Sequence, residues 1–439
     1  MTDENRQPAH HKGGKDAAKK KASREPLVNP YVSGTFRAVD VTTEGRDPRH
    51  VKPRAQEDRP VSEGTNYVSL SSHDIAAKKR KPWKTALLAV GVILLVAVFA
   101  VACYAGYVVF SYHRVADNLA LDIDAPTGGA VSQTLGTGST YTITTYNVGF
   151  GAYLPDFSFF MDGGESSRAA SEASCTQAVR DAATYILQQQ PTIALFQELD
   201  IDADRSYHVD EYRLARSVMS AYCSDFAVNY DSAYLFYPLL EPIGASKSGL
   251  ATFSSIQITN ALRRSLPMQS DLSKVAELDR CYTVSRIPVT GNKELVVYNV
   301  HLIAYSKTGT IRQEQIDMLM SDISDEIAAG NYVICGGDFN SELRDANAPV
   351  DASWAEPFPR SSLPAGAHMA IDLLSDGQRA ALSDSNRDAG VTWTSGDDET
   401  FMLDGFIISD NVQMADYSVL DNGFSYSDHM PVRMTFSLK

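Results

Sequence analysis

Cysteine is scarce in this chain, and none of the five cysteines lies at the spacing of a zinc knuckle. A structural zinc site built on thiolates is therefore excluded. Cys335 lies in an apolar run and is predicted to be a buried thiol. Cys175 and Cys223 are a candidate disulfide pair if their domain is exported, because sequence alone does not fix the connectivity. The glycine pattern of a P-loop, the Gly-x-Ser-x-Gly elbow of serine hydrolases and internal repeats are also missing.

Basic residues are few over most of the sequence. The formal net charge is −15, from 39 Lys and Arg against 54 Asp and Glu. Residues 1–111 hold 18 basic and 11 acidic residues, so residues 112–439 hold 21 basic and 43 acidic ones. An acidic surface repels polyanions at long range, which disfavours avid, non-specific binding to duplex DNA. It does not exclude a metal-assisted nuclease.

Charge is absent from the 24 residues Leu87–Phe110, which are almost purely apolar. At about 1.5 Å per residue this run is long enough to cross a bilayer core of roughly 30 Å. A signal peptide would carry about 7–15 apolar residues behind a short leader, whereas more than 80 residues precede this run. The basic residues within Lys78–Lys84 flank its N-terminal side, and the first charge after it is Arg114. The positive-inside rule then predicts a cytoplasmic N-terminus and an extracellular C-terminal part.

The sequence therefore predicts four segments and a single-pass protein of the cell membrane. Residues 1–84 are expected to be a disordered basic cytoplasmic segment, because they combine high charge with few apolar residues. Residues 85–111 are the expected transmembrane helix, and residues 112–140, rich in Thr, Gly and Ser, the expected linker. Residues 141–439 are expected to form one catalytic domain. An anchor followed by an exported domain is typical of a bacterial surface protein.

The C-terminal domain combines many short strand patterns with a few helical ones. Helical periodicity predicts helices over residues 168–190, 210–223 and 311–329. Alternating or apolar runs predict strands over residues 141–147, 192–198, 249–258, 281–289, 294–302, 332–335, 403–409, 414–420 and 431–437. This mixture indicates an α/β or α+β sandwich, with helices packed outside layered sheets.

Six polar motifs stand at the ends of these strand patterns. They are Thr145–Asn147, Phe196–Glu198, Tyr298–His301, Gly336–Asn340, Leu403–Phe406 and Ser427–His429. Each motif alone is typical of a turn or a cap, but together they supply what phosphoester hydrolysis needs. Carboxylate and amide oxygens suit Mg²⁺. Asp or His can activate a water, and His or Asn can support the charged phosphate oxygens.

In their order along the chain, these motifs resemble the endonuclease/exonuclease/phosphatase superfamily. That group includes pancreatic-type deoxyribonucleases, abasic-site endonucleases, neutral sphingomyelinases and inositol-polyphosphate 5-phosphatases. The resemblance covers about residues 141–439 and rests on Asn147, Gln197-Glu198, Asn299-x-His301, Gly337-Asp338-x-Asn340, Asp404 and Ser427-Asp428-His429. It implies a four-layer αββα sandwich, in which two mixed β-sheets face each other between helices and the site lies at one edge.

The resemblance also implies a cofactor, Mg²⁺ or Mn²⁺, and the residues that hold it. Glu198 is the implied principal metal ligand. Asn147 is implied to lie beside the metal, where it helps to orient Glu198 or a bound water, and Asp428 is implied to be a second carboxylate on the metal side. One metal and two metals are both compatible with this set.

The catalytic roles are likewise implied by the resemblance. Asp338 is implied to position or deprotonate the attacking water, while Asn340 holds the phosphate. His429 is implied to contact the scissile phosphate or to act as the base, with its imidazole oriented by Asp404. His301 matches the deoxyribonuclease and sphingomyelinase branches and argues against the abasic-site branch. Both Asp338 and His429 remain candidates for the general base.

Three further features are candidates for binding the substrate. Asn299 belongs to the motif around His301, and Arg205 closely follows the Glu198 motif, where it can reach a substrate phosphate or lie in a solvated loop. The aromatic stretch Phe150–Gly164 is expected to be either a wall of the cleft or a packed surface cover.

We therefore expect a membrane-anchored, extracytoplasmic hydrolase that attacks a phosphodiester or phosphomonoester with a metal-assisted water. Nucleic acid, a phospholipid headgroup and a phosphorylated polyol all remain open as substrates. The alternatives are a deoxyribonuclease-type nuclease, a catalytically inactive binding protein of the same fold, and a cytoplasmic interaction arm that uses the Lys-rich residues 15–21. No obligate protein partner is indicated, and the oligomeric state is open.

Overall fold

The structure is a computed structural model that describes residues 81–269, 278–304, 310–345, 355–394 and 399–439. Residues 1–80 of the predicted cytoplasmic segment, including the Lys-rich stretch 15–21, lie outside the described residues. The first described element is helix α1 (Pro82–Ser111), which begins with proline at its N-terminal end, where the missing N–H costs nothing. Within the described ranges, α1 is the one helix long and apolar enough to cross a membrane.

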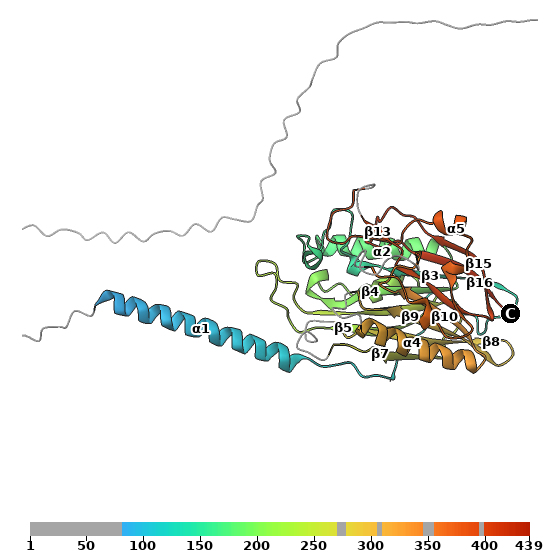
Figure 1. The fold of residues 1–439 in the computed structure, drawn as a ribbon, viewed down its shortest axis with the longest axis horizontal. Coiled ribbons are helices and arrows are strands. Elements are labelled where there is room, and N and C mark those ends of the chain that lie inside the picture. Colours follow the sequence, from blue (N-terminus) through green and yellow to red (C-terminus); the bar gives the residue numbers. More distant parts are fainter. Residues whose placement is uncertain (1–80, 270–277, 305–309, 346–354, 395–398) are drawn as a thin grey trace, which may run out of the picture. The chain divides into compact units, whose positions relative to one another are not determined.

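Two mixed seven-stranded sheets stack on each other (Figure 1). The first sheet has the order β1 (Leu119–Ala120), β7 (Asn260–Ser265), β8 (Cys281–Val289), β9 (Lys293–His301), β10 (Tyr332–Asp338), β14 (Asp404–Ser409), β11 (Ala367–Met369). The second has the order β15 (Val412–Val419), β16 (Val432–Leu438), β3 (Thr140–Asn147), β4 (Ile193–Ala203), β6 (Ser246–Ser254), β5 (Cys223–Asp231), β2 (Ile123–Asp124). In the first sheet β9 and β10 are parallel, and in the second β3 and β4 are parallel.

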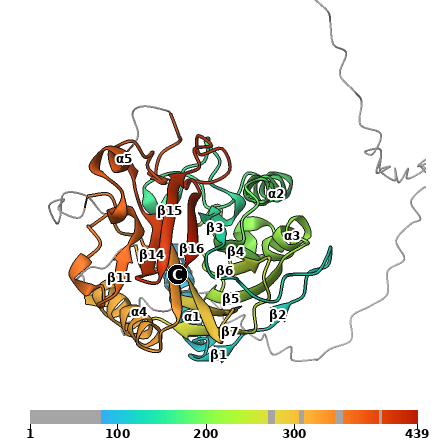
Figure 2. The ribbon, with the colours of Figure 1, turned by 90° about the vertical axis from the view of Figure 1, so that its right-hand side faces the viewer.

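Helices cover the outer faces of both sheets, as Figure 2 shows. Helices α2 (Glu172–Gln188) and α3 (Glu211–Val218) pack on the second sheet, and α4 (Thr310–Ala328) packs on the first. Short elements occupy the connections: α5 (Asp376–Ala380), the pair β12 (Asn386–Arg387) and β13 (Thr400–Phe401), and the 3₁₀ helices Gly149–Gly151, Phe160–Asp162, Asp204–Ser206, Arg360–Ser362 and Ala370–Leu373. The predicted four-layer αββα sandwich is confirmed.

Strand β5 illustrates why part of the sheet was not predicted. Its buried residues include the polar Ser224, Asp225 and Asn229, and Asp225 and Asn229 lie on the same face of the strand. A pattern search for apolar alternation misses such a strand because its buried face is polar. Strand β7 was missed for the same reason, since it buries Arg263.

The predicted linker, residues 112–140, is part of the domain. Its strand β1 pairs with β7 of the first sheet, and its strand β2 pairs with β5 of the second. The backbone N–H of Val115 donates to Asp279 Oδ2 at 2.5 Å, and Leu135 is fully buried in the core. These contacts escape a sequence pattern because each strand is only two residues long.

The candidate disulfide is not formed, because Cys175 and Cys223 are both free thiols with separate surroundings. The Cys175 thiol contacts Glu211 Oε1 at 3.2 Å, whereas the Cys223 thiol donates to the carbonyl oxygen of Ser254 at 3.3 Å. Cys335 is a buried free thiol, as predicted.

A carboxyl group lies in the interior between the two sheets. Asp225 of β5 is fully buried, and the Ser285 hydroxyl of β8 donates to its Oδ2 at 2.6 Å. Burial raises the pKa of Asp225 to about 7, although hydrogen bonds from Ser285 and Thr252 oppose the rise. The folded protein therefore holds a proton that the unfolded chain releases near its ordinary pKa of about 4. This part of the stability is full below that pKa and is lost as the pH rises through about 7.

Asp225→Asn should therefore raise the melting temperature at pH 8, by about 3–8 °C, because the amide carries no ionisation cost. The gain should shrink as the pH falls toward 4. Asp416→Asn, at a half-exposed carboxylate of β15, is the control and should leave the pH profile unchanged. Differential scanning calorimetry between pH 4 and pH 8 measures both, and an Asp225→Asn variant no more stable than wild type at pH 8 would contradict this account.

Candidate active site

The two parallel strand pairs end at the same edge of the sandwich. Strand β3 ends at Asn147, and Glu198 lies in the neighbouring strand β4. In the opposite sheet, β9 ends at His301 and β10 ends at Asp338, which are directly paired in the strand register. This topology brings together four motifs that are far apart in the sequence, and it confirms the predicted clustering of these strand ends.

Glu198 has a backbone conformation that turns its side chain out of the strand. Its φ is 57°, and the pairing of β4 with β6 shifts register between Phe196 and Leu199. A bulge of this kind re-aims a side chain, and a left-handed glutamate costs of order 1–3 kcal/mol. The Glu198 side chain, 23% exposed, consequently faces the cleft while its neighbours stay in the core.

The end of β10 depends on a glycine. Gly337 has φ 148°, and a Cβ at this position would lie 2.0 Å from the carbonyl oxygen of Val300. Only glycine allows β10 to run this close to β9 and to place Asp338 at the edge. Asn340, in the left-handed region at φ 47°, donates its backbone N–H to Asp338 Oδ1 at 2.8 Å. Its side-chain amide donates to the carbonyl oxygen of Leu302 at 2.8 Å, which fixes both residues.

Asn147 is the centre of the polar network. Its Nδ2 lies 3.0 Å from Glu198 Oε1, 3.1 Å from Asp338 Oδ2 and 3.4 Å from His429 Nε2. Its Oδ1 accepts the backbone N–H of Gly149 at 3.0 Å, which fixes the orientation of the amide. One side chain thus holds the acids of both sheets at a common point.

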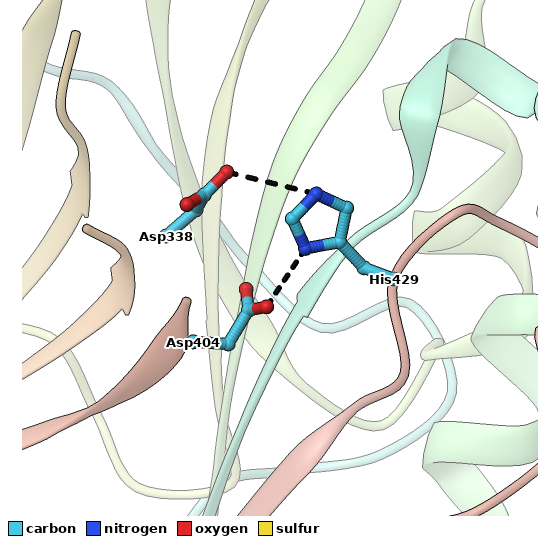
Figure 3. Close-up of side chains that lie close together, drawn as sticks. All are labelled: Asp338, Asp404 and His429. Atoms are coloured by element: carbon cyan, nitrogen blue, oxygen red, sulfur yellow. Dashed lines mark hydrogen bonds and ion pairs between the residues drawn. The ribbon is translucent and has the colours of Figure 1, made fainter. Parts of the chain in front are cut away.

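His429 lies between two buried carboxylates, as Figure 3 shows. Its Nδ1 is 2.7 Å from Asp404 Oδ2, and its Nε2 is 3.8 Å from Asp338 Oδ2. Burial alone would lower the pKa of His429, but the charges of Asp404 and Asp338 raise it to about 10. The imidazole is therefore a cation at neutral pH in the absence of metal, with its ring fixed by Asp404.

The remaining ionisable groups are shifted mainly by burial. Burial and the neighbouring Asp428 raise the pKa of Glu198, and burial raises the pKa of Asp338 to about 7. Burial and the charge of Arg280 hold the pKa of His301 well below its usual value, so His301 is neutral. His301 Nε2 lies 3.6 Å from Asp338 Oδ2 and 3.8 Å from Glu198 Oε1. The carboxylates of Glu198 and Asp338 therefore lie close together, and a bound cation would offset their repulsion.

This donor set fits a hard divalent cation. Glu198 and Asp428 offer carboxylate oxygens in the cleft, while Asn147, whose Nδ2 donates to Glu198 and whose Oδ1 accepts from Gly149, orients the Glu198 carboxylate. A second group of possible ligand atoms, on Asp338, Asp404 and His429, lies within 4.8 Å of one another. A metal on that second group would have to break the 2.7 Å contact between His429 and Asp404.

The site opens into a cleft of about 290 Å³. Its floor is formed by Glu198, His301, Asp338, Asn340, Asp428 and His429, and one wall by Phe150, Tyr153, Phe159 and Met161. The three aromatic rings of this wall are also buried against one another. The stretch Phe150–Gly164 is thus a cleft wall and a packed cover at once, so the two expectations are not exclusive.

Arg205 lines the same cleft and is not in a solvated loop. Its side chain is buried, and its Nε and Nη2 donate to the two carboxylate oxygens of Asp200 at 3.0 and 2.8 Å. Its guanidinium stacks 3.8 Å from the centre of the Phe150 ring. Arg205 therefore supports the aromatic wall and adds positive charge beside it.

Asn299 lies beneath the cleft and does not line it. Its side chain is fully buried, and its Oδ1 accepts from Gln197 Nε2 at 2.8 Å. Its Nδ2 donates to the carbonyl oxygens of Ala251 and Phe196 at 3.0 and 3.2 Å. The predicted substrate contact is wrong, because this amide is used to join the two sheets. Every other predicted site residue lines the cleft or, like Asn147 and Asp404, directly contacts residues that do.

Sequence reasoning missed three residues of the site. The Ser385 hydroxyl donates to Asp404 Oδ2 at 2.8 Å, and Asn386 Nδ2 lies 3.0 Å from His429 Nε2. Arg280 lines the cleft and donates to the carbonyl oxygens of His301 and Leu302. Ser385 and Asn386 lie in a segment with no apolar periodicity, so the sequence carries no signal that separates them from turn residues.

Comparison with known protein families identifies one that this chain matches. The model described as "Endonuclease/Exonuclease/phosphatase family" matches residues 144–429. The chain belongs to this family. Members of the endonuclease/exonuclease/phosphatase family are hydrolases that act on phosphoesters, and the family is divalent-metal dependent. The predicted membership is confirmed, and none of the curated proteins matches the sequence.

Solved structures of the family resemble the fold at low sequence identity. An endonuclease/exonuclease/phosphatase from Beutenbergia cavernae is 15% identical, with a TM-score of 0.48, over 68% of this chain and 72% of that chain. Truncated TDP2 of Caenorhabditis elegans is 16% identical, with a TM-score of 0.44, over 69% of this chain and 98% of that chain. The human Nocturnin catalytic domain is 17% identical, with a TM-score of 0.44, over 73% and 98%.

Asp404→Asn should lower the pKa of His429 from about 10 by about one pH unit or more, because it removes the carboxylate that raises this pKa most. Nuclear magnetic resonance titration of ¹³C-labelled histidines, in EDTA, measures the change. Asp384→Asn is the control, since Asp384, which precedes Ser385 in the sequence, forms an ion pair with Arg344 and not with His429. A His429 titration that is the same in Asp404→Asn and in wild type would contradict the assigned ion pair.

Proposed function

We propose that this chain is a single-pass membrane protein whose extracytoplasmic domain hydrolyses phosphoesters with Mg²⁺ or Mn²⁺. One observation carries the proposal. The Asn147 amide lies within 3.4 Å of Glu198, Asp338 and His429, two carboxylates and an imidazole that come from separate parts of the chain and line one cleft. A structural network has no need to leave Glu198 in a strained conformation facing open space.

Glu198 and Asp428 would hold the cation, with Asn147 beside it. When bound, the cation supplies charge neutralisation at a non-bridging phosphate oxygen. Asn147 keeps the Glu198 carboxylate in one orientation through its 3.0 Å hydrogen bond, so the ligand is ordered before substrate arrives. Oxygen donors of this kind favour Mg²⁺ and Mn²⁺ over softer ions.

Asp338 is better suited than His429 to accept the proton of the attacking water. Its pKa of about 7 would make it an effective general base near neutral pH. His429, with a pKa of about 10, retains its proton and can donate from Nε2 to the phosphate. Asp404 holds the opposite ring nitrogen, so the imidazolium keeps its charge and its direction.

The other cleft residues would contact the phosphate or the leaving group. Asn340 lies beside Asp338 and faces the cleft, and the neutral His301 lies on the other side of Asp338. Arg280 and Arg205 add positive charge to the cleft lining, and they would attract the anionic ester into an otherwise acidic domain.

The proposed topology rests on α1. Basic residues in Lys78–Lys84 precede the apolar run, and the first charge after it is Arg114, so the N-terminus is cytoplasmic and the catalytic domain outside. The α1 side chains are almost all exposed, as expected for a helix that faces lipid.

The full chain in detergent should hydrolyse bis-p-nitrophenyl phosphate with Mg²⁺ or Mn²⁺, and EDTA should abolish the activity. Glu198→Ala, Asp338→Ala and His429→Ala should each lower kcat by about 10²–10⁴. The reason differs among the variants. Glu198→Ala removes a metal ligand, Asp338→Ala removes the general base, and His429→Ala removes the group that donates a hydrogen bond to the phosphate. Release of nitrophenolate measures all of them.

Glu165→Ala is the matched control, since it removes an exposed carboxylate from the loop that borders the cleft. It should keep the wild-type rate, and thermal unfolding should show that every variant is folded. Activity that persists in EDTA, or a wild-type rate in folded Glu198→Ala, would refute the proposed function.

A further inference from the structure

The loop between β5 and β6 exposes an unusual amount of apolar surface. We define the apolar loop as Tyr234–Leu240, with the sequence Tyr-Leu-Phe-Tyr-Pro-Leu-Leu and no charge. Phe236 and Tyr237 are 52% and 66% exposed, Leu239 is 71% exposed, and Leu240 is fully exposed. Scattered exposed leucines are ordinary, but several large apolar side chains at one loop tip mark a surface that contacts something apolar.

The apolar loop lies beside the C-terminal part of α1. The Tyr104 hydroxyl accepts the backbone N–H of Phe236 at 2.9 Å and donates to the carbonyl oxygen of Tyr234 at 3.1 Å. The Tyr107 hydroxyl accepts the backbone N–H of Tyr234 at 3.3 Å. Since α1 ends at Ser111, Tyr104 is about 10 Å before the helix end at 1.5 Å per residue. The loop thus reaches the last two turns of the apolar helix, at the depth of a membrane interface.

The same loop also contacts the wall of the cleft. The rings of Tyr237 and Phe160 are 5.6 Å apart. Phe160 lies between Phe159 and Met161, which both line the cleft, and the Met161 side chain is 68% exposed. Apolar surface therefore continues from α1, across the apolar loop, to the mouth of the cleft.

We infer that the apolar loop inserts into the outer interface of the lipid bilayer that α1 spans, and that it seats the mouth of the cleft against lipid headgroups. This inference rests on the proposed function, which supplies both the membrane-spanning helix and the hydrolysis of a phosphoester. It narrows the substrate to a phosphoester that lies at the membrane surface. Tyrosines suit the headgroup region and leucines suit the acyl region. The nearest charge along the chain, Glu241, follows the apolar residues, where the chain turns back toward the domain.

Fluorescence quenching tests the contact between the apolar loop and the bilayer without an activity assay. The full chain is reconstituted in phosphatidylcholine vesicles whose acyl chains carry bromine, and the emission added by Leu240→Trp is compared with that added by Leu373→Trp. Leu373 is a matched exposed leucine in the connection after β11. Bromine quenches an indole only at short range, so the emission added at position 240 should fall by at least half and that at position 373 should not. Equal quenching at the two positions overturns the inference.

An activity comparison tests the consequence. The double variant Leu239→Glu/Leu240→Glu should keep the wild-type rate on bis-p-nitrophenyl phosphate in detergent, because neither residue lines the cleft. It should lose at least tenfold in the release of phosphorylated headgroup from vesicles of phosphatidylcholine and phosphatidylglycerol, whereas Leu373→Glu should not. Equal vesicle rates for the double variant and wild type overturn the inference.

Two further outcomes keep the hypotheses apart. Quenching of the Leu240→Trp variant at position 240, together with a wild-type protein that is inactive on bis-p-nitrophenyl phosphate, refutes the proposed function and supports the membrane contact. A detergent-solubilised dimer that the double variant converts to a monomer, with no quenching at position 240, shows that a second copy of the chain covers the loop, and it overturns the inference.

Discussion

Two amide contacts across the interior hold the two sheets in the alignment on which the site depends. Gln197 of β4 donates to Asn299 of β9 at 2.8 Å, and Asn147 of β3 donates to Asp338 of β10 at 3.1 Å. Each contact joins a strand of one parallel pair to a strand of the other. A buried amide without its partner is costly, so sliding one sheet past the other would leave several polar groups unsatisfied. The sandwich therefore has one favourable register, and this register determines which acids meet at the edge.

The electrostatics of the edge follow from this alignment. Acidic side chains that water would screen are held close together in the interior, where their charged forms are costly. The positive charge of His429, which stays protonated between Asp404 and Asp338, compensates part of this electrostatic cost. The cost at Glu198 is not fully compensated, and the pKa of Glu198 is therefore raised. The proposed divalent cation would offset this remaining electrostatic cost.

Sequence patterns were sufficient to predict a strand where its buried side chains are apolar. The apolar runs of β4 and β10 end in Glu198 and Asp338, so both strands and both acids were predictable, and the family resemblance supplied their order. Patterns failed where the interior is polar, as in β5 with Asp225, and where pairing is brief, as in β1 and β2. They also failed at Asn299, because its motif position does not reveal that its side chain points between the sheets. The direction of such a side chain is set by tertiary packing, which a local sequence pattern does not show.

The contact between Val115 and Asp279 has a consequence for how the domain is carried. That contact is one of several that begin directly after α1, since the Tyr112 hydroxyl contacts Met268 Sδ at 3.4 Å and His113 Nε2 lies 3.1 Å from Asp231 Oδ2. In the proposed membrane topology, these contacts hold the domain close to the bilayer surface and restrict its rotation about α1. Under the same proposal, the rate at which the domain meets a lipid substrate would depend on the surface density of that lipid in the membrane and little on its concentration in solution.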